Sequence, residues 1–233
     1  MKSHWELIVG LAGLLLLLGA HYNGLFVAPP EAMMGDVGRI LYVHVPTAWV
    51  GLLTYLVAFI AAVGAIWSGK WAWDAMVEAS VEVGLLLNVL LLLQGSLWAK
   101  PTWGVYWTWD PRLTTCAIMV VAFGVVLALR RQIHDPARRL TISSVATIIA
   151  FVNVPIVYLS VKWWRTLHQT YSSPETVDGA MVTPLRVAAF GMLFLVTGFV
   201  VRRWRQVRAK IDVEVTAPDL PDAPKPLNVE NSP

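Results

Sequence analysis

Two histidines and a tryptophan-rich segment are the parts of this sequence best suited to bind a ligand. His44 lies in the stretch "LYVHVPTAWVG", His168 lies in "KWWRTLHQTYS", and the segment 103–109 holds three tryptophans and a tyrosine. A neutral imidazole nitrogen is a common metal ligand and can serve as an axial ligand of haem iron. Indole rings offer a broad apolar face that can stack on a flat porphyrin and keep one N–H for a polar group. These residue types indicate haem binding, provided that the fold brings them together.

Other chemistries are poorly represented in the sequence. The single cysteine, Cys116, excludes an internal disulfide, a CxxC metal site and a CxxCH haem-attachment motif, so any haem would be held non-covalently. The stretch "GAIWSGKW" contains the spacing GxxxxGK, but Trp71 stands where a phosphate-binding loop needs Ser or Thr to reach magnesium. We therefore expect no nucleotide site, no catalytic role and no nucleic-acid partner for this chain.

The elements that must position these residues are membrane-spanning helices. Of the 233 residues, 57% are hydrophobic and only 14% are charged, which is too little charge for a soluble surface. Apolar runs close to the roughly 20 residues that cross a bilayer recur along the chain, and lipid-exposed backbone of this kind must form helices. The first run has the leucine-rich core of a signal peptide, but no small-residue cleavage site follows it, so we expect an uncleaved span. The sequence thus predicts an all-α polytopic membrane protein with six transmembrane helices, at Trp5–Val27, Val45–Trp67, Met76–Trp98, Leu113–Leu129, Leu140–Val161 and Pro184–Val201.

The distribution of basic residues predicts the orientation of these spans. Twelve of the 18 Lys and Arg residues lie at the N-terminus, in the second and fourth loops, and after the last span. The positive-inside rule then places both termini in the cytoplasm and the loops 28–44, 99–112 and 162–183 outside. Residues 1–205 are expected to form one six-span domain. Residues 206–233 form a cytoplasmic tail whose proline-rich end is expected to be disordered.

This orientation gathers the candidate ligands at one membrane face. His44, the tryptophan loop and His168 all fall on the outer side, and His21 at the outer end of the first span is a third candidate. His4 and His134 are expected on the cytoplasmic side, where they could not share a site with the tryptophans. The basic residues on the outer side, which suit the anionic propionates of a haem, are Lys100, Arg112, Arg165 and Arg186.

Simpler structural roles account for many of the same residues. The tryptophans of segment 103–109 could belong to an interfacial belt, and a single histidine at a span boundary is often only an interfacial polar group. Asp110 followed by Pro111 is a typical helix start, with an N-cap and a proline at the first helical position. The tryptophans that we expect in the belt are Trp49, Trp67, Trp71, Trp73, Trp98, Trp163, Trp164 and Trp204.

Polar residues within the spans have two open interpretations. Glu78 and Glu82 lie one helical turn apart near the cytoplasmic end of the third span, where they could line a path or form interhelical hydrogen bonds. Asn153 and Pro155 predict a kink in the fifth span, with the asparagine satisfying a carbonyl that the proline frees.

A resemblance to a known family sharpens the haem hypothesis. The stretch "WGVYWTWDPRLT" closely resembles the WWD signature of haem-handling proteins, whose usual form is WGxWWxWDxRLT, and it departs at Tyr106. Because tyrosine changes the size and polarity of that ring, Tyr106 is a weaker stacking candidate than Trp107. The stretches "LYVHVPTAW" and "WWRTLHQ" resemble the segments that supply the two haem-ligand histidines of the family. Six spans with the motif between the third and fourth resemble the cytochrome c maturation protein C (haem exporter protein C) branch.

The resemblance implies a non-enzymatic handover of non-covalent haem b at the periplasmic face of the bacterial inner membrane. A membrane-anchored haem chaperone would take up the haem, and an ABC-type ATPase with its membrane subunits and a small membrane subunit would complete the complex. His44 and His168 are then the axial ligands of the haem iron, and His21 falls outside the matching segments. The haem-presenting loop would hold Trp103, Trp107, Trp109 and Asp110. Arg112 is assigned as a propionate partner from its charge and location.

Three classes of function follow, and the haem-presenting subunit is favoured among them. A haem permease would need a polar path through the spans. A cofactor-free membrane scaffold would use the aromatic loop to dock a partner protein.

Overall fold

The computed structural model describes residues 4–169 and 178–216, and the described part of the chain is helical with no strands. A π-helical stretch, η1 (Asn23–Val27), extends the first helix, and a 3-10 turn, η2 (Asp36–Ile40), precedes the second. The α-helices are α1 (Trp5–Tyr22), α2 (Leu41–Ser68), α3 (Trp71–Trp103), α4 (Pro111–Gln132), α5 (Pro136–Phe151), α6 (Asn153–Trp163) and α7 (Gly179–Thr216). Six helical stretches of these residues are long and apolar enough to cross a membrane, which confirms the prediction of six spans.

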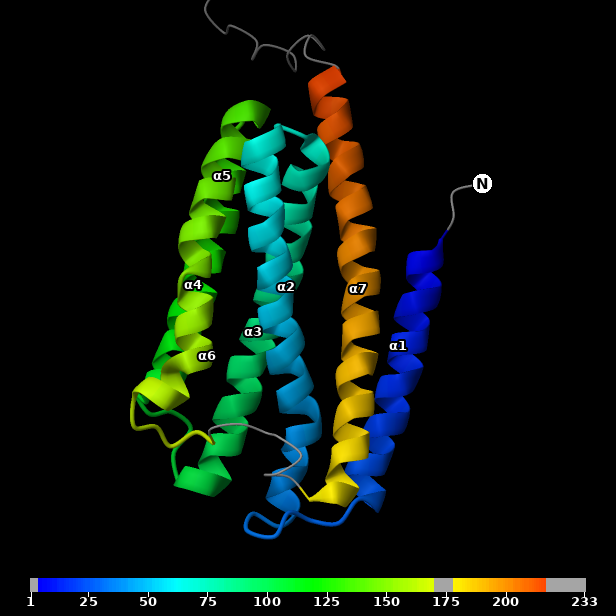
Figure 1. Ribbon diagram of the computed structural model, residues 1–233, viewed down its shortest axis with the longest axis vertical. Helices are drawn as coiled ribbons and strands as arrows, with labels where there is room; N and C mark the ends of the chain where they lie inside the picture. Colours follow the sequence, from blue (N-terminus) through cyan, green and yellow to red (C-terminus); the bar gives the residue numbers. More distant parts are fainter. Residues whose placement is uncertain (1–3, 170–177, 217–233) are drawn as a thin grey trace, which may run out of the picture.

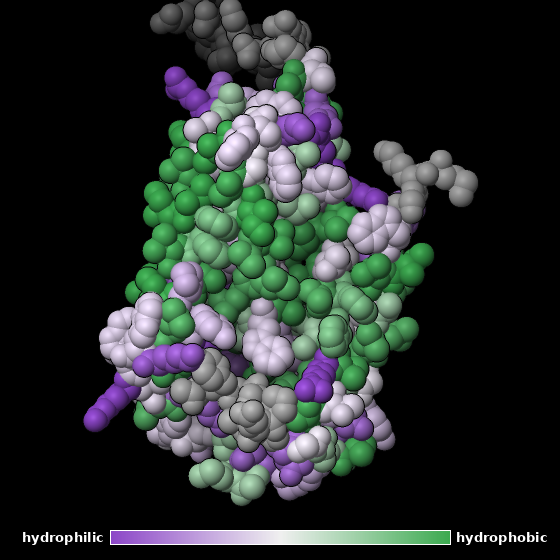
Figure 2. Space-filling view, viewed as in Figure 1, coloured by the Kyte–Doolittle hydropathy of each residue, from purple (hydrophilic) through white to green (hydrophobic). Residues whose placement is uncertain are grey.

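The spans run alternately up and down, so the connections collect at two ends of the bundle. In Figure 1 the segments 28–40, 104–110 and 164–169 lie at the lower end, and the described chain begins and ends at the upper end. Apolar side chains cover the middle of the face in Figure 2, while polar side chains gather towards the two ends, as a bilayer requires. The tryptophan loop and both candidate histidines therefore share one end of the molecule.

The helices reach further than the apolar runs predicted, and this corrects two positions. His44 lies inside the first turn of α2 and not in the loop before the span. The loop between the third and fourth spans comprises 104–110 and not 99–112, because α3 continues to Trp103. Gly104 ends α3 in the left-handed conformation, with φ of 80°, and its N–H bonds to the Lys100 carbonyl.

The start of α4 confirms the predicted cap. The Asp110 carboxylate accepts a hydrogen bond of 2.9 Å from the Arg112 N–H, and Pro111 occupies the first helical position.

The fifth span is broken at Val152 into α5 and α6, which confirms the predicted kink near Pro155. The predicted hydrogen-bond partner of the Asn153 side chain, a carbonyl freed by Pro155, was wrong. Its side-chain N–H₂ donates at 2.8 Å to the Thr115 carbonyl of α4 and not to a carbonyl of its own helix. The asparagine therefore joins two spans at the break.

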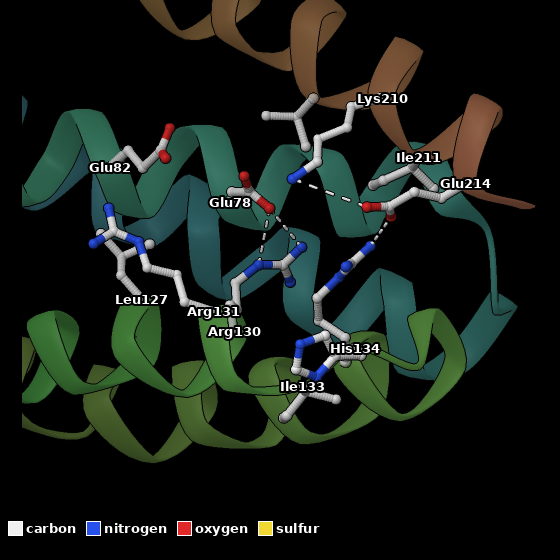
Figure 3. Close-up of a pocket in the computed structure, with 12 residues that line it drawn as sticks. Glu78, Glu82, Leu127, Arg130, Arg131, Ile133, His134, Lys210, Ile211 and Glu214 are labelled. Carbon is white, nitrogen blue, oxygen red and sulfur yellow. Dashed lines mark hydrogen bonds and ion pairs between the residues drawn. The ribbon is translucent and has the colours of Figure 1, made fainter. Parts of the chain in front are cut away.

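An ion-pair network that is buried at Arg130 and Asp74 joins the helices at the end opposite the tryptophan loop. Arg130 of α4 is only 4% exposed and contacts Asp74 at 2.6 Å and Glu78 at 2.8 Å, both on α3. Arg203 of α7 pairs with Glu82, so both candidate glutamates form interhelical hydrogen bonds. Figure 3 shows Glu78, Glu82 and Arg130 of this network around a small cavity of about 290 Å³, with Lys210 and Glu214 paired on the α7 side. The network consists of two groups of ion pairs, with Asp74, Glu78, Glu82, Arg130 and Arg203 in one and Arg139, Lys210 and Glu214 in the other.

The first span packs on the last through glycines. A Cβ added at Gly13 of α1 would lie 2.6 Å from the Gly191 carbonyl oxygen of α7, and one added at Gly198 would lie 2.9 Å from the Gly10 Cα. Small residues at such positions let helix backbones approach closely in a membrane. In Figure 1 α1 lies at the edge of the bundle beside α7.

Candidate functional site

A cavity of about 860 Å³ opens at the end of the bundle that carries the tryptophan loop. This size is in the range of about 300–1,000 Å³ that is usual for pockets for small molecules and cofactors. Walls of the cavity come from α2, α3, α4, α6 and the segment 164–169. Of the residues predicted as ligand-binding, those that line it are His44, Trp103, Trp107, Arg112 and His168, whereas Trp109 and Asp110 do not.

The two histidines face each other across this cavity although 124 positions separate them in the sequence. Their ring centroids are 6.3 Å apart and their planes meet at 36°. His44 is 8% exposed, and its Nδ1 atom is buried with no hydrogen-bond partner among the described residues. A buried polar nitrogen without a partner is costly, so this atom is a candidate for contact with a ligand.

A hydrogen bond holds His168 in the tautomer that leaves the lone pair of Nε2 available to a metal. Its Nδ1 lies 2.8 Å from the Gln169 carbonyl, which can only accept, so Nδ1 carries the proton and Nε2 keeps its lone pair. Burial lowers the pKa of His168 below its ordinary value of 6.5, and the positive charge of Arg112 acts in the same direction. The imidazole is therefore neutral at pH 7, which is the state that binds metal.

The separation of the two rings fits one metal ion between them. Two imidazoles that bind a metal from opposite sides, with metal–nitrogen distances of about 2.0–2.1 Å, have centroids about 6 Å apart. Among the described residues no group of three His, Cys, Asp or Glu side chains could hold a bare ion. A haem brings four nitrogen ligands of its own and needs only axial groups from the protein, so the pair of histidines fits haem.

Aromatic side chains form much of the remaining wall. Trp98 meets His44 edge to face, with ring centroids 5.4 Å apart and planes at 76°. Trp49 and Trp98 were predicted only as members of the interfacial belt, and the structure shows that both also line the cavity with Trp103 and Trp107. The sequence could have revealed this role of Trp98, because the residues that α3 contributes to the cavity wall recur at the spacing of one helix face. They include Gly95, Trp98, Ala99, Thr102 and Trp103.

The outer part of the tryptophan loop faces away from the cavity. Trp109 is 78% exposed and packs edge to face on Trp107, with centroids 5.7 Å apart. Tyr106, where the sequence departs from the WWD signature, is 57% exposed, and the Lys100 ammonium lies 5.3 Å from its ring centroid. These rings offer a surface at the mouth of the site and do not line its interior.

Arg112 lines the cavity but is fixed by the backbone of α6. Its Nη1 donates to the carbonyl of Val157 and, at 3.3 Å, to that of Tyr158. Sequence reasoning gave Arg112 only a role towards an anionic ligand. The structure adds a second role, because the same guanidinium joins α4 to the half-span beyond the break.

The other histidines lie outside the cavity. His21 has its Nε2 3.2 Å from the Tyr42 carbonyl, so this ring is already partnered. His134 lies beside the ion-pair network at the opposite end, as Figure 3 shows. His4 lies near the start of α1, where its ring contacts Glu6 at 3.7 Å. The predicted separation of His4 and His134 from the tryptophans is confirmed.

Comparison with known proteins finds the family that the WWD signature resembles. The sequence profile of the family described as Heme exporter protein C (CcmC) matches residues 1–217. Heme exporter protein C of Bradyrhizobium diazoefficiens is 34% identical over 205 residues, which cover 85% of this chain and 77% of the relative. Heme exporter protein C of Escherichia coli strain K12 is 33% identical over 201 residues, with 85% and 82% covered. A putative cytochrome c biosynthesis ccmC-like mitochondrial protein of Marchantia polymorpha is 31% identical over 205 residues, with 87% of each covered. The chain therefore belongs to the Heme exporter protein C family.

Proposed function

We propose that the protein binds non-covalent haem b in the 860 Å³ cavity, with His44 and His168 as the axial ligands, and presents it to a haem chaperone during c-type cytochrome maturation. The observation that carries the proposal is the pair of imidazoles 6.3 Å apart in an aromatic cavity, one of them with a buried nitrogen that lacks a partner. Trp103 and Trp107 contribute flat apolar walls for the porphyrin. Arg112 places a positive charge at the wall, suited to a propionate.

The exposed rim of the site suits a handover partner. Trp109 and Tyr106 stand at the cavity mouth with large exposed fractions. Exposed aromatic groups next to a pocket are typical of protein interaction surfaces. In this proposal they meet the membrane-anchored haem chaperone, while an ABC-type ATPase, its membrane subunits and a small membrane subunit complete the assembly. The protein itself binds and positions haem and catalyses no reaction.

We further propose that the cavity faces the periplasm of a bacterial inner membrane. The described chain begins and ends at the end opposite the cavity, and that end carries most of the Lys and Arg residues. The positive-inside rule assigns that basic end to the cytoplasm.

A permease that moves haem through the bundle is supported less well. Met119 forms part of the cavity wall and belongs to a packed core with Tyr55 and Phe123, whose rings stack with centroids 3.6 Å apart. Beyond this core the ion-pair network joins α3, α4 and α7. A haem would have to disrupt both layers to cross, whereas presentation at one face requires neither change.

Visible spectroscopy tests the haem site directly. The protein purified in detergent and supplied with haem should give a Soret band and a low-spin spectrum. His44→Ala and His168→Ala should each lose the low-spin form, and His21→Ala serves as the matched control because its ring contacts a backbone carbonyl outside the cavity. A wild-type protein without a Soret band would favour the cofactor-free scaffold. A spectrum unchanged in both ligand variants would overturn the ligand assignment.

Labelling from the two sides of the membrane tests the orientation. Single cysteines introduced at the exposed positions 106 and 131, in a Cys116→Ser background, sample the two ends of the bundle. A membrane-impermeant reagent should label position 106 from the periplasm and position 131 only after the membrane is opened. The reverse pattern would contradict a periplasmic site.

Haem supplied only from outside should remain at the cavity in a presenting subunit, whereas a permease would move it inward.

A further inference from the structure

The segment that carries His168 is fixed by the aspartate of the WWD motif. Residues 164–169 follow α6 without regular helix or strand, so the position of His168 depends on contacts with other parts of the chain. Asp110 is 7% exposed and does not line the cavity. Its carboxylate instead lies against the His168 segment, 56 and 57 positions away in sequence.

Three hydrogen bonds satisfy this carboxylate. Asp110 Oδ1 accepts from the Arg112 N–H at 2.9 Å and from the Thr166 hydroxyl at 2.7 Å, and Oδ2 accepts from the Leu167 N–H at 2.8 Å. A buried carboxylate requires such donors, and hydrogen bonds to a charged group are stronger than neutral ones. One aspartate thus caps α4 and holds the His168 segment against the start of that helix.

The Thr166 hydroxyl extends this link to His168 itself. It donates its proton to Asp110 and accepts the His168 N–H at 3.1 Å. A hydroxyl can donate and accept at the same time, and the methyl groups of valine can do neither. The Asp110 carboxylate, the Thr166 hydroxyl and the His168 backbone therefore form one continuous chain of hydrogen bonds.

From this chain we infer that Thr166 is a positioning residue, which holds the His168 imidazole at the cavity through Asp110 without contacting the ligand. The inference rests on the proposed function in one respect, namely that His168 is a haem ligand. It assigns the aspartate of the motif a task that differs from the stacking of the motif's tryptophans on haem. The WWD motif supplies aromatic walls through Trp103 and Trp107, and through Asp110 it places the second axial group.

Replacing the hydroxyl tests the inference. In Thr166→Val the ratio of six-coordinate low-spin haem to five-coordinate high-spin haem should fall roughly 10- to 100-fold, which corresponds to the loss of a hydrogen bond to a charged group. Added imidazole should restore the low-spin spectrum, because the open axial position accepts an external ligand. Thr166→Ser keeps the hydroxyl and should keep the wild-type spectrum. Thr166→Ala should match Thr166→Val, which separates loss of the hydroxyl from any steric effect of valine.

The matched control is Thr197→Val in α7, because the Thr197 hydroxyl bonds only to the Leu193 carbonyl of its own helix. This variant should keep the low-spin spectrum. The inference is overturned if Thr166→Val and Thr166→Ala both retain wild-type low-spin haem, or if Thr166→Ser fails as they do. Failure of the proposed function gives a different result, since wild type would then bind no haem or His168→Ala would leave the spectrum unchanged.

Discussion

The two ends of the helical bundle differ in their main buried polar groups. At the end with the ion-pair network, Arg130 donates to Asp74, Glu78 and Ser143, so a buried charge has partners on two other helices. At the end with the cavity, His44 Nδ1 and Trp98 Nε1 are buried and have no hydrogen-bond partner within residues 4–169 and 178–216. The same two helices, α3 and α4, contribute to both ends.

This difference separates stability from function within one bundle. A satisfied buried network fixes how helices pack, whereas each buried polar group without a partner costs about 1–3 kcal/mol. Proteins tolerate such a cost where a ligand recovers it. We therefore expect the cavity end of the apo protein to be the less stable part of the fold, and variants at the two ends should affect different measurements.

The largest effect is expected from Arg130→Ala. Removing this guanidinium leaves Asp74 buried without its partner, and the free energy of unfolding should fall by about 3–5 kcal/mol. Chemical unfolding in detergent measures the change. Arg131→Ala, at an exposed neighbouring position, is the control and should stay within about 0.5 kcal/mol of wild type. The haem spectrum of the folded fraction should not change in either variant, and a changed spectrum would break the separation of the two ends.

The opposite pattern is expected from His44→Leu. Leucine has a similar size and removes the buried nitrogen that lacks a partner, so the apo protein should gain up to about 1 kcal/mol of stability. The same variant should lose low-spin haem. Paired unfolding and haem titrations on wild type and His44→Leu check both outcomes. A large loss of apo stability would show that His44 is a structural residue first.

Acidification should release haem only at pH values below the ordinary pKa of histidine. Haem binding needs neutral His168, and burial lowers the pKa of this imidazole below 6.5, so the neutral form persists as the pH falls through that value. The unfolded chain binds a proton there first, and the contribution of His168 to apo stability therefore declines as the pH drops below 6.5. A series of haem titrations from about pH 8 to about pH 5, roughly 1.5 pH units either side of the ordinary histidine pKa, measures this dependence. Loss of low-spin haem already above 6.5 would contradict the expectation.

The smallest effect is expected from Trp98→Phe. Phenylalanine keeps a flat ring beside His44 and removes the indole N–H that has no partner, so the two consequences offset each other. Haem affinity should change by no more than a few-fold, within about 1 kcal/mol. Trp163→Phe, which changes an exposed ring, is the matched control. A much larger loss in Trp98→Phe alone would mean that the indole N–H bonds to the ligand.

The sequence was sufficient for the spans and for the end at which the candidate ligands meet. Apolar runs in a chain with so little charge leave helices as the available structure, and an even number of spans returns the chain to its starting side. This parity is enough to place His44 and His168 at the same end of the bundle. The exact helix ends did not follow, because polar residues such as Lys100 continue α3 past the apolar core.

The sequence could not predict the contacts between distant polar residues. The Arg130–Asp74 pair spans 56 positions, and only packing selects this partner for the arginine. The same is true of Asp110 and Thr166. Trp98 is different, since helical spacing along α3 could have placed it with Trp103, but its location near a span end favoured the interfacial belt.

The glycine contacts between α1 and α7 have a consequence for how the chain can be rebuilt. Because the Gly13 and Gly191 backbones meet with no side chain between them, α1 is matched to α7 residue by residue. A leucine-only anchor of the same length would insert into a bilayer but could not dock there. Exchanging the first 27 residues for an unrelated membrane anchor should therefore leave α7 exposed to lipid, whereas a fusion placed ahead of the native segment preserves the contact.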